Sequence, residues 1–185
     1  MPLVSIGMPV FNNEATLKTV IDSLLGQSFA NFELIISDNG STDSTSAICQ
    51  KYVKKDARIV YVRQLVNIGL YQNLKYVFDQ GKGRYFLWAA GDDVRSSEFL
   101  EENVQFLETH ADYVASTSPN CFEDLDPVGD NLVTFEIVGT IEERFDQFFK
   151  NCWQSHGIFY SVFRKEILSD CNVLGQSFTG ADWAI

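Results

Sequence analysis

The chain has 185 residues, of which 45% are hydrophobic and 14% aromatic, so it can build one domain with an ample core and is not a disordered chain. Its formal net charge is −11. No basic stripe can displace counterions from phosphates, so we expect no nucleic-acid partner. A small anionic ligand would need a metal ion or local cations to neutralise it.

Cysteine usage and the N-terminus indicate the compartment. Four cysteines stand 72, 31 and 19 positions apart, without a CxxC pair or a zinc-ligand spacing, at Cys49, Cys121, Cys152 and Cys171. We expect reduced core thiols in a cytoplasmic protein. The chain opens on a strand-like run instead of a signal peptide, and no run of about 18 apolar residues is present. Peripheral association with the inner face of the membrane stays open.

In the first half, strand-like apolar runs alternate with helical apolar stripes. We expect strands at residues 3–9, 32–37, 58–62 and 85–90. The first helix is predicted from apolar residues spaced three and four apart, at Leu17, Val20, Ile21, Leu24 and Leu25. The later helices run through Ile48 and Tyr52, from about Leu70 to Gly81, and from Ser97 to His110.

Strands alternating with helices are the sequence form of right-handed βαβ units, so the predicted fold class is α/β, a mostly parallel central sheet with helices on both faces. Ligands bind such sheets outside the carboxyl ends of the strands. The polar residues that follow the first, second and fourth strands, at 11–14, 38–43 and 91–93, should therefore lie along one edge.

In the second half, strands and helices no longer alternate regularly. Residues 112–117, 131–138 and 158–163 are strand-like, and 140–150 are predicted to form a helix capped by Thr140. We interpret this half as an irregular α+β extension of the same sheet.

The chain is organised around the run from Arg84 to Val94, a buried strand that breaks into Gly91, Asp92 and Asp93. Two adjacent carboxylates repel each other, so we expect a divalent cation there, with Asp93 as its ligand and Asp92 accepting a hydrogen bond from a ligand hydroxyl. The alternative is a turn in which one aspartate only caps the next helix. No GxGxxG or P-loop sequence is present, so phosphates would need a metal.

Five segments in order carry a family resemblance: SIGMPVFNNE, ELIISDNGSTDST, NIGLYQN, GDD and GADWAI. They resemble the motifs of family 2 glycosyltransferases with the GT-A fold, and GDD resembles a variant of the DXD metal motif. The match covers essentially the whole chain. It implies a nucleotide-diphospho-sugar donor, foremost a UDP-sugar, and inverting transfer to a sugar or lipid-linked sugar acceptor, assisted by Mn²⁺ or Mg²⁺.

Carried over to this sequence, the resemblance implies a donor-binding half at 1–110 and an acceptor-side half of the same domain at 111–185. The nucleobase would be bordered by Pro9, Val10, Phe11 and Glu14. Asp38 would accept a hydrogen bond from the base, and Asp92 would hold the ribose or sugar. Asp93 would bind the metal that bridges the two phosphates, and Asp182 would be the general base that deprotonates the acceptor hydroxyl.

The sequence departs from the family pattern at two places. Ala90 stands where the first aspartate of DXD is usual, so donor phosphates are expected to complete the metal coordination. The chain ends three residues after Asp182. We therefore expect a C-terminally truncated chain that binds donor but transfers sugar poorly.

Several of these residues have a structural alternative. Asp38 and Asp43 can cap the turn and helix that follow, and Glu14 is favourable in a first helical turn whether or not it meets a ligand. His156 is interpreted as a partly buried structural histidine, and the alternative is that it faces the donor pyrophosphate. For the whole chain, the alternative is a non-catalytic nucleotide-sugar or carbohydrate binding module with the same fold; a phosphoacceptor receiver domain fits the irregular second half poorly.

Overall fold

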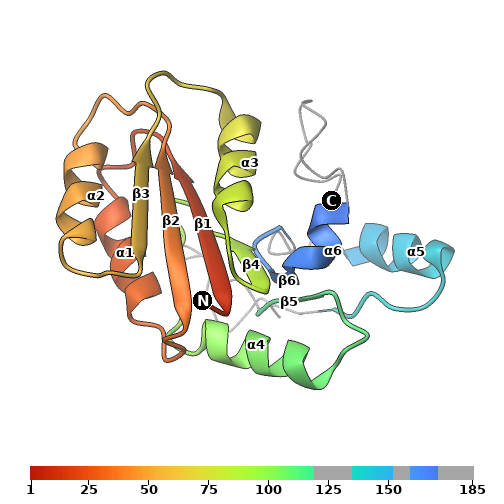
Figure 1. Cartoon of the computed structure of the whole chain (residues 1–185). Coiled ribbons are helices and arrows are strands. Elements are labelled where there is room, and N and C mark those ends of the chain that lie inside the picture. The colour runs from red at the N-terminus through yellow and green to blue at the C-terminus, as the bar shows by residue number, and fades with distance from the viewer. Residues whose placement is uncertain (119–134, 152–158, 171–185) are drawn as a thin grey trace, which may run out of the picture.

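A computed structural model describes residues 1–118, 135–151 and 159–170 and has the predicted α/β architecture (Figure 1). The strands are β1 (Val4–Val10), β2 (Phe32–Asp38), β3 (Ile59–Arg63), β4 (Tyr85–Trp88), β5 (Ala115–Ser116) and β6 (Val162–Arg164). The helices are α1 (Leu17–Leu25), α2 (Thr45–Val53), α3 (Leu70–Gln80), α4 (Phe99–Thr109), α5 (Ile141–Asn151) and α6 (Lys165–Asp170). The sheet order is β3-β2-β1-β4-β6-β5.

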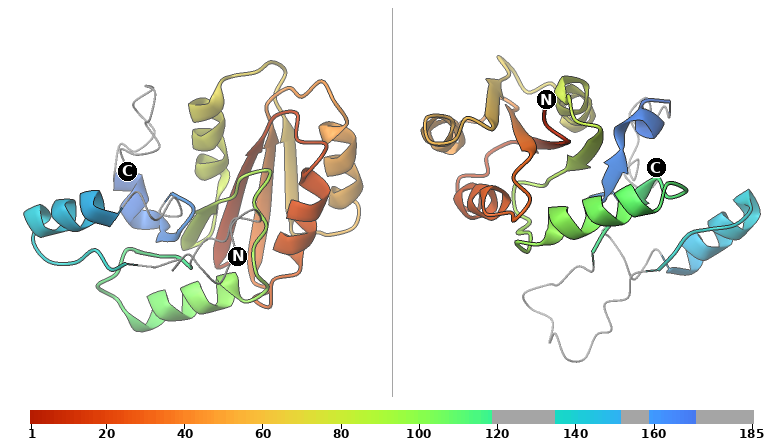
Figure 2. Two further views of the ribbon diagram at one scale, coloured as in Figure 1. Left: turned by 180° about the vertical axis from the view of Figure 1, so that it is seen from behind. Right: turned by 60° about the horizontal axis from the view of Figure 1, so that its bottom comes forward.

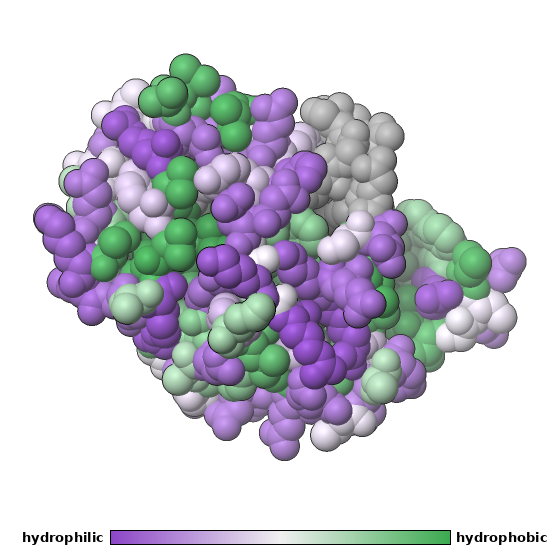
Figure 3. Space-filling model, viewed as in Figure 1, coloured by the Kyte–Doolittle hydropathy of each residue, from purple (hydrophilic) through white to green (hydrophobic). Residues whose placement is uncertain are grey.

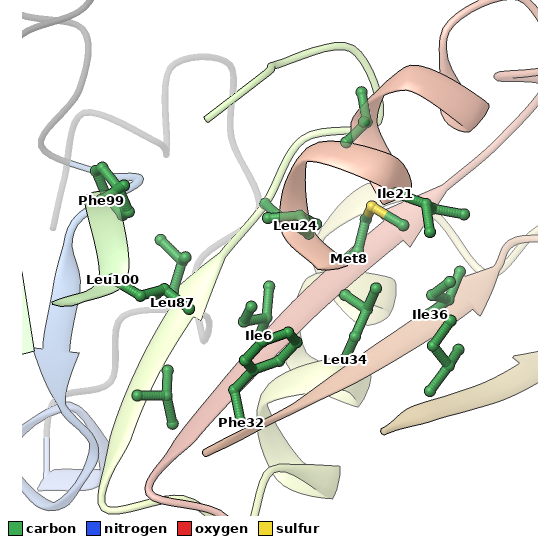
Figure 4. Close-up of a cluster of buried hydrophobic side chains, with 14 of the residues drawn as sticks. Ile6, Met8, Ile21, Leu24, Phe32, Leu34, Ile36, Leu87, Phe99 and Leu100 are labelled. Carbon is green, nitrogen blue, oxygen red and sulfur yellow. The ribbon is translucent and has the colours of Figure 1, made fainter. Parts of the chain in front are cut away.

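Helices cover both faces of the sheet, as the alternating pattern predicts (Figure 2). One core cluster joins α1, α2 and α4 to alternate residues of β1, β2 and β4. Figure 4 shows strand residues such as Ile6, Met8 and Leu34 pointing toward Ile21 and Leu24 of α1. The second cluster packs α3 and α6 on the opposite face. Both faces are therefore closed, and ligand binding is left to the strand ends and the loops.

The central pair of strands separates before the neighbouring pair does. β1 pairs with β2 as far as Val10 with Asp38, but with β4 only as far as Gly7 with Trp88. Gly7 faces β4, because its carbonyl accepts a hydrogen bond from the N–H of Ala89 at 2.9 Å. Pro9 is the next β1 residue that faces β4, and it has no N–H to donate. The β1–β4 ladder therefore ends here, and β4 leads into the acidic turn.

The second half extends the sheet with antiparallel strands, as the α+β interpretation predicts. Its strand boundaries are corrected. The strand predicted at 158–163 is Val162–Arg164, and α6 follows it at once. The strand predicted at 131–138 is absent from its described part, 135–138, and residues 131–134 lie outside the described residues. The Thr140 cap is confirmed: Thr140 Oγ1 accepts the N–H of Glu143, and Glu143 accepts the N–H of Thr140.

One of the four predicted core thiols, Cys49, lies among the described residues. Cys49 is fully buried, and burial together with the Asp38 charge raises its pKa to about 12, so the thiol stays protonated; the other cysteines lie outside the described residues. Hydrophilic residues cover most of the face in Figure 3. Across the described ranges, no helix has the length and apolar character needed to cross a membrane.

Candidate functional site

The loops that follow β1, β2 and β4 meet at the carboxyl edge of the sheet, which confirms the predicted convergence. The N–H of Asn12 donates to Ser41 Oγ at 2.9 Å and joins the first two loops. Thr16 Oγ1 donates to the carbonyl of Gly91 at 2.7 Å and joins the first loop to the acidic turn. A Cβ on Gly91 would lie 2.8 Å from the Asn13 side chain, so these segments are in close contact.

The four residues predicted to border a nucleobase differ in exposure. Val10 is buried and Pro9 half-buried, whereas Phe11 is 44% exposed at the edge. Glu14 is exposed, and its carboxylate accepts the N–H of Ser44 at 2.9 Å, at the start of α2. Phe11 therefore presents a free aromatic surface, while Glu14 already stabilises a helix N-terminus.

Asp38, the last residue of β2, is fully buried and hydrogen-bonded. Its Oδ1 accepts the N–H of Ser41 at 2.8 Å, and its Oδ2 accepts the Tyr61 hydroxyl at 3.0 Å. Burial raises the pKa of Tyr61 to about 12, so this phenol remains a donor. Arg63 Nε lies 3.6 Å from the same Oδ2. The turn-capping role of Asp38 is thus present, and its contact with a base stays a prediction.

Asp43 links the loops that follow β1 and β2. Its Oδ1 accepts the N–H of Thr45 at 2.9 Å, at the first residue of α2, so the predicted cap is confirmed. Its Oδ2 accepts the N–H of Glu14 at 3.1 Å. With Glu14 reaching back to Ser44, the two acidic side chains fix the start of α2 against the first loop.

Asp92 and Asp93 follow β4 on the exposed turn, and among the described residues neither carboxylate accepts a hydrogen bond. Partial burial of the Asp93 carboxyl raises its pKa; Arg95 opposes this rise, and the Asp92 charge adds to it. An unpaired carboxylate beside a like charge gains from a bound cation.

The described residues can hold a divalent cation only if other ligands, such as substrate phosphates, complete its coordination. The described ranges contain no group of three or more His, Cys, Asp or Glu side chains able to hold a metal. Two neighbouring carboxylates are hard oxygen ligands, and Mg²⁺ is commonly bound in this way, by one or two carboxylates together with waters and substrate phosphates. The turn suits a metal that arrives with, or is completed by, a diphosphate.

Arg95 belongs to this turn and was missed by the sequence interpretation. Its guanidinium lies 4.9 Å from the ring centroid of Phe99 in α4 and 5.8 Å from that of Tyr160, which precedes β6. Its Nε and Nη2 atoms are buried without a hydrogen-bond partner in the part of the chain that the structure describes. The only sequence signal was its position two residues after Asp93.

Two predicted positions, Asp182 and His156, lie outside the described residues. The described edge therefore brings together the loops that carry Phe11, Asp38 and Asp93, and the role of Asp182 remains a prediction from the family resemblance.

The fold and this edge define an α/β ligand-binding domain with an acidic turn suited to a divalent cation. Residues 5–170 match the model of glycosyl transferase family 2, and the chain belongs to that family. It carries the family's glycosyltransferase domain, as its curated relatives do.

Relatives and solved structures agree with this assignment. The chain is 36% identical over 125 residues to the putative glycosyltransferase EpsE of Bacillus subtilis, covering 66% of this chain and 45% of that protein. It is 34% identical over 106 residues to the putative teichuronic acid biosynthesis glycosyltransferase TuaG of Bacillus subtilis, covering 57% and 42%. The chain thus spans less than half the length of these relatives. The structure of S. aureus TarS 1–349 shares the GT-A fold, with a TM-score of 0.75 at 20% identity over 98% of this chain and 53% of that one.

Proposed function

We propose that the domain transfers a sugar from a nucleotide-diphospho-sugar, foremost a UDP-sugar, to an acceptor hydroxyl with inversion. The observation that carries this proposal is the turn bearing Asp92 and Asp93, whose carboxylates have no described hydrogen-bond donor at the edge where α/β sheets bind ligands. Structures of TarS in complex with UDP and with UDP-GlcNAc support the choice of donor. A mannosyltransferase of Pyrobaculum calidifontis solved with GDP-Man and Mn²⁺ supports a divalent metal.

In this proposal Asp93 would hold the metal, and oxygens of the donor diphosphate would complete its coordination because Ala90 supplies none. A bound metal would supply Lewis acidity that stabilises the leaving diphosphate. Asp92 accepts a hydrogen bond from a hydroxyl of the ribose or sugar and so orients the anomeric carbon. Partial burial and the Asp92 charge raise the pKa of Asp93 because its ionised form is poorly solvated, and a bound cation would offset that loss.

The transfer itself is an in-line displacement. The acceptor oxygen forms a bond to the anomeric carbon as the bond from that carbon to the diphosphate oxygen breaks, which inverts the configuration. The acceptor proton passes to the Asp182 carboxylate, acting as general base, and the electron pair of the broken bond leaves with the diphosphate. This role of Asp182 rests on the resemblance of GADWAI to the family's late aspartate motif.

The nucleobase is assigned to the first two loops. The ring of Phe11 is exposed and offers a surface for stacking beside the backbone of Pro9 and Val10. A carboxylate has about four lone-pair sites, and the contacts of Asp38 with Ser41 and Tyr61 use two, so it retains capacity for a base N–H. Because Asp38 is fully buried, this contact requires the loop after β2 to move.

The test is a calorimetric titration of UDP into the chain with Mn²⁺ and again with EDTA, repeated on Asp93→Ala. We expect binding that depends on the metal and is lost in the variant. A folded chain that binds neither UDP nor another nucleoside diphosphate would contradict the proposal.

The second candidate is a non-catalytic nucleotide-sugar binding module, which Ala90 favours because it removes one carboxylate from the usual motif. Asp182→Asn separates the two functions. In a transferase this substitution abolishes transfer and spares UDP binding, whereas in a binding module there is no transfer to lose. We also propose a cytoplasmic location with a sugar or lipid-linked sugar as acceptor, which cell fractionation and acceptor screening would test.

A further inference from the structure

The guanidinium of Arg95 is held firmly at the end of the acidic turn. The Arg95 N–H donates to Ser23 Oγ at 3.3 Å, which ties the turn to the end of α1. The side chain lies against the rings of Phe99 and Tyr160 at 4.9 and 5.8 Å. Aromatic faces attract a guanidinium and restrict its plane. The cation is therefore positioned between the carboxyl edge and the segment that enters β6.

Two N–H groups of this cation are unused. Nε and Nη2 are shielded from solvent and donate to no residue in the described ranges. They lie on one edge of the planar group, the edge that grips both oxygens of a phosphate or carboxylate. Among the described ion pairs none joins Arg95 to Asp93, although the two charges interact.

Such an arrangement is costly unless a ligand uses it. A buried cation with unmade hydrogen bonds loses hydration without recovering it. In a chain of net charge −11, an anionic substrate needs local positive charge, and Arg95 supplies it beside the metal-binding turn.

We propose that the Nε–Nη2 edge of Arg95 binds an oxyanion of the substrate, a phosphate or a carboxylate, next to Asp93. The inference rests on the proposed function for the source of this oxyanion, which is either the donor diphosphate or an anionic group on the acceptor. Shielding from water strengthens a charge-assisted, two-pronged contact of this kind. It also means that the turn rearranges as the ligand enters, a local change common on binding.

The experiment uses three probes on the full chain with Mn²⁺: UDP, inorganic pyrophosphate, and inorganic phosphate added to the UDP-loaded chain. The variants are Arg95→Gln, which removes the charge, and Arg95→Lys, which keeps the charge but loses the two-pronged edge. Arg84→Gln is the matched control, because Arg84 is exposed and paired with Glu108. Circular dichroism and melting verify folding, and Arg95→Lys carries the comparison if Arg95→Gln does not fold.

We expect Arg95→Gln to weaken the affinity for at least one probe by about 10-fold to 100-fold. The affinity of Arg95→Lys should lie between those of wild type and Arg95→Gln, and Arg84→Gln should change the affinity for none of the probes. Weaker UDP and pyrophosphate binding assigns the oxyanion to the donor; weaker phosphate binding alone assigns it to the acceptor. Equal affinity of wild type and both Arg95 variants for all probes, with UDP bound, overturns this inference and leaves the proposed function standing. A folded wild type that binds none of the probes overturns both.

Discussion

Charged groups at the amino edge and at the acidic turn of the carboxyl edge differ in their hydrogen bonding. At the amino edge, the nearly buried carboxylate of Glu33 accepts the Ser5 hydroxyl at 2.6 Å and the N–H of Lys82 at 2.8 Å. At the carboxyl edge, Asp93 has no described donor and Arg95 has two unused N–H groups. Satisfied groups stabilise the chain, whereas unsatisfied groups are available to a ligand. Glu33 therefore stabilises the fold, whereas Asp93 and Arg95 are groups that we propose bind ligand.

The largest expected effect is on ligand binding at the carboxyl edge. Asp93→Asn should weaken Mn²⁺-dependent UDP binding by about 100-fold or more, because it removes the proposed metal ligand. Binding in EDTA should not change between wild type and variant. Calorimetry with and without metal checks this, with Asp79→Asn, an exposed residue paired with Lys75, as control. If Asp93→Asn kept its metal-dependent affinity for UDP, the metal would have to bind elsewhere than at Asp93.

The next effect is on stability at the amino edge. Glu33→Ala should lower the free energy of unfolding by about 1 to 3 kcal/mol, because the Ser5 hydroxyl loses its acceptor and the Lys82 N–H keeps only Ser5 Oγ. UDP affinity should stay within about twofold of wild type. Urea denaturation measures the first quantity and calorimetry the second. Glu33→Gln keeps an acceptor oxygen and should lose less stability. If Glu33→Ala weakened UDP binding as much as Asp93→Asn does, the two edges would not be separate in function.

A smaller effect tests the coupling of the acidic turn to the first loop. Gly91→Ala places a Cβ 2.8 Å from the Asn13 side chain, so it should cost about 1 to 2 kcal/mol of stability and displace the turn. Part of that cost should disappear when Gly91→Ala is combined with Asn13→Ala, which removes the clashing atoms. A double-mutant cycle by urea denaturation measures this coupling energy. If the two stability changes were strictly additive, Gly91 and Asn13 would not be energetically coupled.

The smallest effect concerns pH and Asp93. Because its pKa is raised in the folded protein, folded Asp93 binds a proton more tightly than the unfolded chain does, so its ionisation lowers stability as pH rises above its ordinary value of 3.8. Asp93→Asn should therefore be slightly more stable than wild type at pH 7, by less than about 0.5 kcal/mol for this exposed side chain, and should lose that advantage below pH 3.8. Urea denaturation at both pH values checks the sign, and a variant that is less stable at pH 7 contradicts it.

The same proton competes with the metal. Since the raised pKa moves protonation of Asp93 to higher pH than for an ordinary aspartate, Mn²⁺-dependent UDP affinity should begin to fall at mildly acidic pH. Titrations in a pH series measure this, and the EDTA series serves as the control for effects on the nucleotide alone.

The sequence predicted most reliably what periodicity determines. α1 runs from Leu17 to Leu25, the ends of the predicted apolar stripe, because one buried helix face requires that spacing. The bounds predicted for β6 were wrong because the length of this strand depends on the neighbouring strands with which it pairs. β6 pairs with β4 through Arg164 and Phe163 and with β5 through Phe163 and Val162, so the described residues 159–161 of the predicted strand have no strand partner. Strand pairing is set by tertiary contacts that no local pattern contains.

The candidate site also has features that the sequence predicted and features that it could not predict. The order of polar loops and the acidic turn predicted the shared edge, because parallel strands bring their carboxyl ends together. The burial of Asp38 under Tyr61 and the placement of Arg95 between Phe99 and Tyr160 were not predictable. Each depends on residues more than 20 positions away or on another element, and a lone arginine after an acidic turn reads as an ordinary surface residue.

Pro9 sets the depth of the candidate site from a neighbouring strand. Any other residue there would offer an N–H toward β4 and allow the β1–β4 ladder to extend past Trp88. That extension would draw the backbone before Gly91 into the sheet and narrow the space in front of Asp92 and Asp93. A change at Pro9 can therefore alter the shape of this edge while every acidic residue stays the same.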